Sequence, residues 1–269
     1  MGHVTFVSAG PGAAYLITLR GARALAGAEV VLFDALTDPA LREMAPAARW
    51  IDVGKRGCSG RGSPGHPGGH EARQTAINAL LVEQARTHQR VVRLKGGDAS
   101  IFGRLEEELL ALAEAGIECE VIPGVTAALA AAAQTQRPLT RRGQGRSVSL
   151  TTAMTRDGIL QARRSADTEV LYMAGLQLKS LGHKLIEAGW PPQTPVSVVS
   201  RAGCADALTS EHCVANLAAA AALHQGRPTV VIVGAGAGPL RQQSNGHASK
   251  SLISSGLDEH QALAKTLTD

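Results

Sequence analysis

Two glycine-rich turns hold the residues of this sequence that are best suited to bind a ligand. Residues 93–104 read Arg-Leu-Lys-Gly-Gly-Asp-Ala-Ser-Ile-Phe-Gly-Arg, so an apolar strand ends in two glycines and Asp98 before a helix that opens with Leu-Glu-Glu-Glu. Paired glycines expose backbone amides and carbonyls, and the Asp98 carboxylate can accept hydrogen bonds from hydroxyl or amino groups. Residues 122–127, Ile-Pro-Gly-Val-Thr-Ala, form a second small-residue turn in which Thr126 can donate a hydrogen bond. Each turn alone also fits an ordinary connection between a strand and a helix.

A third turn, Ser-Ala-Gly-Pro-Gly at residues 8–12, directly follows the first apolar run. Glycines there let the backbone turn sharply and approach a ligand at the carboxyl edge of a sheet. A dinucleotide fingerprint requires G-x-G-x-x-G, and this chain has Tyr15 where the third glycine belongs. Asp34 ends the second apolar run, where a dinucleotide-binding enzyme places its ribose-binding acid. The missing glycine disfavours a nicotinamide-dependent dehydrogenase.

Basic side chains gather in two polar segments. Lys55 and Arg56 open a stretch with many glycines, and four arginines, Arg141 and Arg142 among them, lie within residues 137–146 without an acid. Arginine pairs well with carboxylates, so either cluster could bind a polyanionic small molecule, although a solvated basic face has the same composition. The formal net charge is +4, and only 3% of the residues are aromatic. So few rings argue against a surface that stacks nucleobases, and we expect no nucleic-acid partner.

The cysteines and the apolar runs indicate the compartment. The four cysteines are scattered and form no CxxC pair, which argues against a disulfide scaffold and favours a reducing, cytoplasmic compartment. His66 and His70 could suggest a metal site, but Cys58 is their one partner at convincing ligand spacing, so no metal is expected. No signal peptide is evident and no apolar run reaches the roughly 18 residues of a membrane span, so we expect no membrane partner.

Apolar, β-branched runs alternate with helical patterns along most of the chain. Helices of this length between strands need crossover connections, so the pattern predicts an α/β protein with mainly parallel sheets. The polar stretch at 137–146 divides the pattern, which predicts an N-terminal domain over 1–137, a C-terminal domain over 146–240 and a flexible tail over 241–269. Strands are expected at 3–9, 29–33, 50–53, 90–94, 118–122, 147–151, 169–173, 195–200 and 228–233, and helices at 15–26, 73–87, 105–115, 178–188 and 216–223.

The motifs in this order resemble the tetrapyrrole methylase superfamily and, within it, the C-methyltransferases of uroporphyrinogen III. The resemblance covers residues 4–233 and rests on Gly-Pro-Gly, Val-Leu-Phe-Asp, Val-Gly-Lys-Arg, Arg-Leu-Lys-Gly-Gly-Asp, Ile-Phe-Gly-Arg, Pro-Gly-Val-Thr-Ala and Arg-Pro-Leu-Thr. It implies two α/β domains with mainly parallel sheets and an active site in the cleft between them. It also implies a homodimer, and S-adenosylmethionine (SAM) as the co-substrate.

The same resemblance assigns roles to individual residues. Asp34 is expected to accept a proton from the substrate and Lys55 to donate one, with Arg104 and Glu107 as alternatives for activating the substrate. The substrate is an octacarboxylate, and the cations expected to bind its carboxylates are Arg56, Arg141 and Arg142. The residues expected to contact SAM are Pro11, Gly96, Gly97, Asp98, Ile101, Thr126, Ala127, Met173 and Ala202.

The implied activity is methylation of carbons 2 and 7 of uroporphyrinogen III, which gives precorrin-2 for the sirohaem, cobalamin or haem d1 branch. The chain departs from the family pattern at five places: Ala13 replaces an aspartate, Ala99 a proline, Arg141 and Met154 each a histidine, and the loop over 57–70 is longer. These departures leave two alternatives open. One is a SAM methyltransferase of the same fold with another acceptor, a later precorrin or a non-tetrapyrrole. The other is a paralogue that binds tetrapyrrole or SAM without catalysis.

Overall fold

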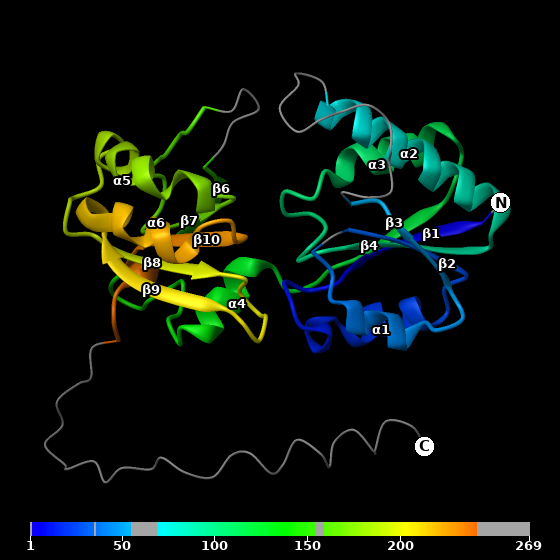
Figure 1. The fold of residues 1–269 in the computed structure, drawn as a ribbon, viewed down its shortest axis with the longest axis horizontal. Coiled ribbons are helices and arrows are strands. Elements are labelled where there is room, and N and C mark those ends of the chain that lie inside the picture. The colour runs from blue at the N-terminus through cyan, green and yellow to red at the C-terminus, as the bar shows by residue number, and fades with distance from the viewer. Residues whose placement is uncertain (1, 35, 55–68, 154–158, 241–269) are drawn as a thin grey trace, which may run out of the picture. The chain divides into compact units, whose positions relative to one another are not determined.

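The computed structural model describes residues 2–34, 36–54, 69–153 and 159–240, which form two five-stranded sheets with helices packed against them (Figure 1). Both sheets belong to one compact unit that extends to Pro239. Within the described residues, no helix combines the length and the apolar character that a membrane crossing requires. The α/β class expected from the sequence is confirmed.

The first sheet contains only parallel strands. Its elements are β1 (His3–Ser8), α1 (Leu19–Ala26), β2 (Val30–Phe33), β3 (Arg49–Asp52), α2 (Gly69–Thr87), β4 (Arg90–Lys95), α3 (Leu105–Glu114) and β5 (Cys119–Ile122). The strand order is β3-β2-β4-β1-β5, with α2 and α3 on one face and α1 on the other (Figure 1). Strands β1 and β4 are almost wholly buried, because helices cover both faces of the sheet, and their sequences are accordingly rich in apolar residues.

Parallel pairing brings the carboxyl ends of these strands to one edge of the sheet. Ser8 at the end of β1 pairs with Lys95 at the end of β4. Just beyond these ends, Gly10 and Gly97 form an isolated bridge, in which each backbone N–H donates to the other's carbonyl. The turn at 8–12 and the Gly-Gly-Asp turn therefore lie side by side, as expected for motifs that act on one ligand.

The second sheet is mixed. Its elements are α4 (Ala127–Gln134), β6 (Val148–Thr152), β7 (Thr168–Tyr172), α5 (Leu178–Glu187), β8 (Pro195–Ser200), β9 (Leu208–Cys213), α6 (Ala221–His224) and β10 (Thr229–Gly234). The strand order is β6-β7-β10-β8-β9. Only β6 and β7 pair in parallel, while the other three pairs are antiparallel. The parallel pairing expected from the sequence thus holds throughout the first sheet and for one pair of the second.

Two elements have no counterpart among the expected ranges, α4 and β9, although the turn at 122–127 had indicated the start of a helix. Helix α4 is almost pure alanine, so it has no amphipathic period to reveal it, although alanine is the best helix former. It lies before the predicted domain boundary at 137 and packs in the core of the second sheet, with Val170, Val199 and Ile232. Strand β9 is mostly polar, and it lies at the sheet edge. Over the expected helix at 216–223, a 3-10 helix (Val214–Ala220) precedes α6.

Candidate active site

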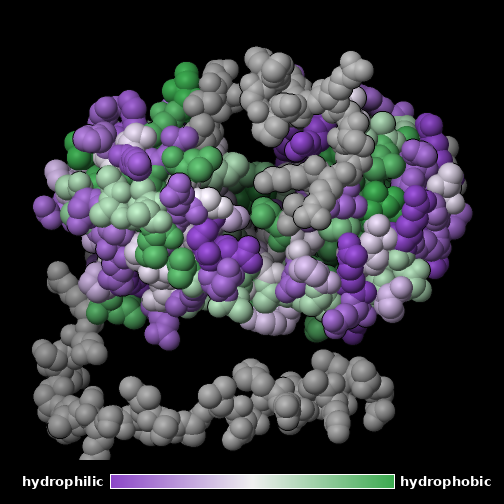
Figure 2. Space-filling view, in the orientation of Figure 1, coloured by the Kyte–Doolittle hydropathy of each residue, from purple (hydrophilic) through white to green (hydrophobic). Residues whose placement is uncertain are grey.

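A cavity of about 830 Å³ opens at the carboxyl edge of the first sheet. Its wall also includes the start of α4 and residues at the ends of β7, β8 and β10 from the second sheet. Figure 2 shows a hollow near the middle of the molecule with hydrophobic residues in its depth and hydrophilic residues around its margin. A largely apolar cavity with a few convergent polar groups is the usual form of a small-molecule site.

Close backbone packing explains the glycines of the cavity wall. A Cβ on Gly12 would lie 2.6 Å from the carbonyl carbon of Gly203, on the turn after β8, so only glycine lets these two turns touch. Gly97 has a φ of +69°, which favours glycine, and a Cβ built there would meet no atom within 4 Å. The backbone of Gly97 is therefore open to a ligand, which fits the role that the motif predicts for it.

Asp98 ties two of the turns together. Its Oδ2 accepts a hydrogen bond from the Gly124 N–H at 2.8 Å, and its Oδ1 accepts bonds from the N–H and hydroxyl of Ser100. Burial opposes ionisation, but these hydrogen bonds prevail and lower the pKa of Asp98 below its ordinary value. The next residue, Ala99, donates its N–H to the Ser8 hydroxyl at 3.0 Å. A proline, which the family usually has at this position, could not make that bond.

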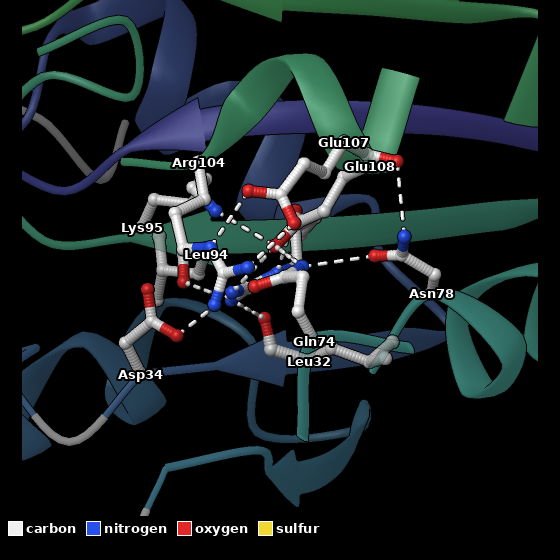
Figure 3. A network of polar contacts seen from close by, with 10 residues as sticks. Leu32, Asp34, Gln74, Asn78, Leu94, Lys95, Arg104, Glu107 and Glu108 are labelled. Atoms are coloured by element: carbon white, nitrogen blue, oxygen red, sulfur yellow. Dashed lines mark hydrogen bonds and ion pairs between the residues drawn. The ribbon is translucent and has the colours of Figure 1, made fainter. Parts of the chain in front are cut away.

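A buried ionic network stands on the wall below the turns (Figure 3). Arg93, 2% exposed, donates from Nε to Glu108 Oε2 at 3.0 Å and from Nη2 to Asp34 Oδ1 at 2.8 Å. Lys95 Nζ donates to Glu108 Oε1 at 2.8 Å, and Gln74 on α2 donates to the same oxygen at 3.2 Å. Two cations and two carboxylates from β4, α3 and the end of β2 therefore neutralise one another on the cavity wall.

The network shifts the pKa values of its members in opposite directions. Burial opposes the charge on Arg93 and on Glu108, but their ionic contacts prevail, so the pKa of Arg93 is raised and that of Glu108 is lowered. For Lys95 burial prevails, and together with the charge of Arg93 it lowers the pKa of the ammonium. Lys95 is thus the cation of the network whose charged form is disfavoured by its surroundings.

Arg104 and Glu107 form a second charged group at the cavity rim. Arg104 precedes α3 with a φ of +52°, and its Nε and Nη2 bind the Glu107 carboxylate at 2.7 and 2.6 Å. Both side chains are more than a third exposed, so the pair stays accessible to a substrate. Arg104 lines the main cavity, whereas Glu107 lines a shallower groove next to it. Sequence reasoning had offered both for substrate activation, and the structure brings them into direct contact.

Tyr172 at the end of β7 connects the second sheet to the turn before α4. Its hydroxyl lies 2.7 Å from Thr126 Oγ1 and accepts the Ala128 N–H at 3.2 Å. Its ring is tilted against that of Phe102, with the centroids 5.0 Å apart. The next residue, Met173, has a φ of +57° and is exposed to the cavity. Sequence reasoning missed Tyr172, and its only signal was its place beside Met173.

The structure brings most of the predicted site residues together. All nine residues predicted to contact SAM line the cavity, as do Asp34 and Arg104. Lys55 and Arg56 lie outside the described residues. Arg93, Lys95 and Glu108 were not predicted as site residues. Two charged residues within an apolar strand, Arg93 and Lys95, could have indicated a buried ionic group.

The structure does not place Arg141 and Arg142 on this cavity. The Arg141 guanidinium donates hydrogen bonds to the carbonyls of Gly238 and Pro239, at the C-terminal end of the compact unit. Arg142 is exposed, and neither residue is among those that line the cavity. Their role as substrate contacts stays a prediction. Among the described residues, no cluster of three His, Cys, Asp or Glu side chains could hold a metal ion.

Comparison with known proteins identifies similar sequences over most of the chain. The family model of the tetrapyrrole (corrin/porphyrin) methylases matches residues 3–223. The uroporphyrinogen-III C-methyltransferase of Pseudomonas aeruginosa is 41% identical over 205 residues, covering 75% of this chain and 80% of that protein. The enzyme of the same name from Synechocystis is 36% identical and covers 87% and 89%. The siroheme synthase of Sodalis glossinidius is 42% identical, but this chain spans only 43% of its length.

Solved structures show the same fold. The uroporphyrin-III C-methyl transferase of Thermus thermophilus, complexed with S-adenosyl homocysteine, matches with a TM-score of 0.73 at 32% identity, covering 87% of this chain and 97% of that one. A cobalt precorrin-4 methyltransferase of cobalamin biosynthesis matches with a TM-score of 0.74 at 26% identity, covering 88% and 96%. The fold therefore does not distinguish between acceptors, whereas sequence identity is higher to the first of these two proteins.

Proposed function

Because the chain belongs to the tetrapyrrole (corrin/porphyrin) methylases, we propose that it transfers methyl groups from SAM to carbons 2 and 7 of uroporphyrinogen III, giving precorrin-2. Two relatives that bear the name uroporphyrinogen-III C-methyltransferase align over three quarters or more of the chain, and this supports the choice of acceptor. Siroheme synthases are about twice as long as the aligned part, so activities of their remaining parts do not carry over.

The observation that carries the proposal is the convergence of the predicted SAM residues on one cavity. Three glycine turns expose backbone there, Asp98 fixes two of them, and apolar side chains such as Ile101 supply a dry surface. These residues fit a ligand with a small polar end and an adenosyl group, and SAM supplies an electrophilic methyl group on a sulfonium. Positioning and exclusion of water by such a wall account for much of the catalysis of an in-line displacement.

The chain's own residues would then handle the substrate and its proton. Asp34 is the proposed proton acceptor: Arg93 holds its Oδ1, and the side chain remains 32% exposed at the cavity. Arg104 is the proposed anchor for a substrate carboxylate, because a guanidinium is too weak an acid to exchange protons at neutral pH. Its partner Glu107 keeps the guanidinium in place until the substrate arrives. The expected roles of Lys55 and Arg56 belong to the same proposal.

The test is anaerobic incubation of the protein with SAM and enzymatically generated uroporphyrinogen III, followed by mass spectrometry and absorbance. We expect a product heavier by two methyl groups. Arg104→Met should raise the substrate KM, and Lys179→Met, at an exposed position on α5, is the matched control. Binding of SAM without any transfer would reject the acceptor and direct attention to later precorrins. No binding of SAM would reject the proposal as a whole.

We also propose that the protein is a cytoplasmic homodimer. The dimer follows the usual assembly of the family, and the scattered free thiols Cys119, Cys204 and Cys213 are compatible with a reducing compartment. Light scattering coupled to size-exclusion chromatography should give twice the chain mass of 27.8 kDa. A monomer at micromolar concentration would contradict the assembly, and recovery in a membrane or secreted fraction would contradict the location.

A further inference from the structure

Lys95 is a buried cation of the cavity wall that has no role in the proposed function. Its side chain is 3% exposed, it lines the cavity, and its Nζ donates to Glu108 Oε1 at 2.8 Å. An ammonium has three N–H donors, and within the described residues Glu108 is the one acceptor found for Nζ. A buried amine at a cavity, with donors to spare, is suited to exchange a proton.

Glu108 does not depend on the proton of Lys95. Its Oε1 also accepts from Arg93 Nη2 at 3.1 Å and from Gln74 Nε2 at 3.2 Å, and its Oε2 accepts from Arg93 Nε at 3.0 Å. When Lys95 loses a proton, Glu108 therefore keeps three donors. Burial lowers the pKa of Lys95, and Arg93 lowers it further, while Glu108 and Asp34 act in the opposite direction. The network thus tolerates both protonation states of Lys95.

The charged groups around Lys95 come from each element of this wall. Arg93 lies on its own strand, Glu108 on α3, and Asp34 just after β2, while α2 contributes the neutral Gln74 (Figure 3). Arg104, at the start of α3, forms an ion pair with Glu107. With Lys95 protonated the four charged groups sum to zero, since two cations face two carboxylates. With Lys95 neutral they sum to one negative charge.

We propose that Lys95 releases its proton when SAM binds and takes up the proton that the methylated tetrapyrrole later loses. The inference rests on the proposed function for its second half only. A sulfonium brings one positive charge into a cavity of low dielectric, and a wall that becomes negative by one charge compensates it. The product, S-adenosylhomocysteine, has a neutral thioether at this position, so its binding needs no compensating negative charge.

The charges balance through each step. The electron pair of the nucleophilic ring carbon forms the new carbon–carbon bond, and the pair of the S–CH₃ bond stays on sulfur as a lone pair. The positive charge then lies on the ring, beside a wall that still carries one negative charge. The ring becomes neutral when a C–H bond breaks and its electron pair returns to the ring. The proton passes by the Asp34 carboxylate to the Lys95 amine, which becomes an ammonium again.

The test counts protons on ligand binding to the full-length protein. SAM and S-adenosylhomocysteine are titrated calorimetrically at about pH 8 in buffers of different ionisation enthalpy. For the unaltered protein we expect SAM to release ~0.5 proton or more, and S-adenosylhomocysteine to release close to none. Lys95→Arg keeps the charge at all accessible pH values, and Lys95→Met has no titratable group, so both should release none with either ligand. Lys179→Met on α5 should behave as the unaltered protein does.

The kinetic expectation separates a proton-exchanging role from a merely structural one. Both Lys95 variants should lower kcat about 100-fold or more, as loss of an acid–base group does. Lys95→Arg, whose fixed charge opposes the sulfonium, should also weaken SAM binding, whereas Lys95→Met should not. Proton release that persists in Lys95→Arg, or none from the unaltered protein, would overturn the inference. If the unaltered protein releases the proton but does not methylate uroporphyrinogen III, the assignment of Lys95 to the SAM step holds and the proposed acceptor fails. If it methylates without release, only the inference on Lys95 fails.

Discussion

The two sheets bury polar groups of different kinds beside the same cavity. Beneath the first sheet's edge the buried groups are ions, with Arg93 and Lys95 paired to Glu108. The second sheet buries one carboxylate, Glu169, away from the cavity, and its buried groups nearest the cavity are neutral: the buried His224 places Nδ1 2.5 Å from the Ser200 hydroxyl, which in turn lies 2.9 Å from Thr229 Oγ1. Thr229 itself lines the cavity. The buried charges that line the cavity thus belong to the first sheet's wall, whereas the charged residues of the second wall, Arg201 and Asp206, form an exposed pair.

Strand direction explains part of this difference. In the parallel sheet, β2 and β4 end at the same edge, so the acid after β2 and the cations of β4 meet without long side chains reaching across. In the mixed sheet, neighbouring strands mostly run in opposite directions, so fewer strand ends reach the cavity. Its contribution is Tyr172, Met173 and the turn at Ala202, whose two charged residues, Arg201 and Asp206, pair with each other. The parallel sheet is therefore suited to the chemistry and the mixed sheet to closing the site.

The sharpest test of the charged wall is Glu108→Gln. The substitution keeps the shape of the side chain but leaves Arg93 and Lys95 as buried cations without their main partner. Breaking a buried ion pair on one side costs about 3–5 kcal/mol, so the free energy of unfolding should fall by that amount. Urea denaturation monitored by circular dichroism at pH 7.5 measures it.

The adjacent residue supplies the matched control. Glu107→Gln makes the same chemical change to an exposed pair with Arg104, and exposed pairs contribute about 0–1 kcal/mol. Equal losses for the two variants would mean that the buried ions are no more important to stability than a surface pair. The two walls would then differ in residue composition but not in how much their buried polar groups contribute to stability.

The sequence predicted the parts of this arrangement that depend on short motifs. The glycine turns and Asp98 follow strand ends, and parallel strand ends meet at one edge, so their convergence could be foreseen. The partners of the buried ions could not, because Glu108 is one of three consecutive glutamates and nothing in the sequence says which one faces inward. The antiparallel pairs were missed for a similar reason. The pattern of β8 and β10 is apolar in either direction.

The contact between the two walls can be weakened through one hydroxyl. Tyr172→Phe keeps the ring against Phe102 but removes the hydrogen bonds with Thr126 and Ala128. A net contribution of about 1 kcal/mol per hydrogen bond predicts S-adenosylhomocysteine affinity lower by about five- to thirtyfold, because Thr126 would lose its fixed orientation. Calorimetric titration gives the affinity. Tyr15→Phe, at a largely exposed tyrosine, is the control, and an affinity change as large in that variant would remove Tyr172 from the site.

The buried His224 of the second sheet should make stability depend on pH in a range where the buried Glu108 of the first does not. Burial, and then the charges of His212 and Arg227, lower the pKa of His224 in the folded protein. The unfolded chain therefore takes up this proton at a higher pH, so stability is lost as the pH falls below about 6.5 and is retained above it. Between pH 7.5 and 5.5, His224→Gln should lose about 1 kcal/mol less free energy of unfolding than the unaltered protein. The lowered pKa of Glu108 keeps it ionised across this window, so Glu108 should contribute no such slope. His183→Gln, at an exposed position on α5, is the control, and a slope that survives His224→Gln would place the pH sensitivity elsewhere.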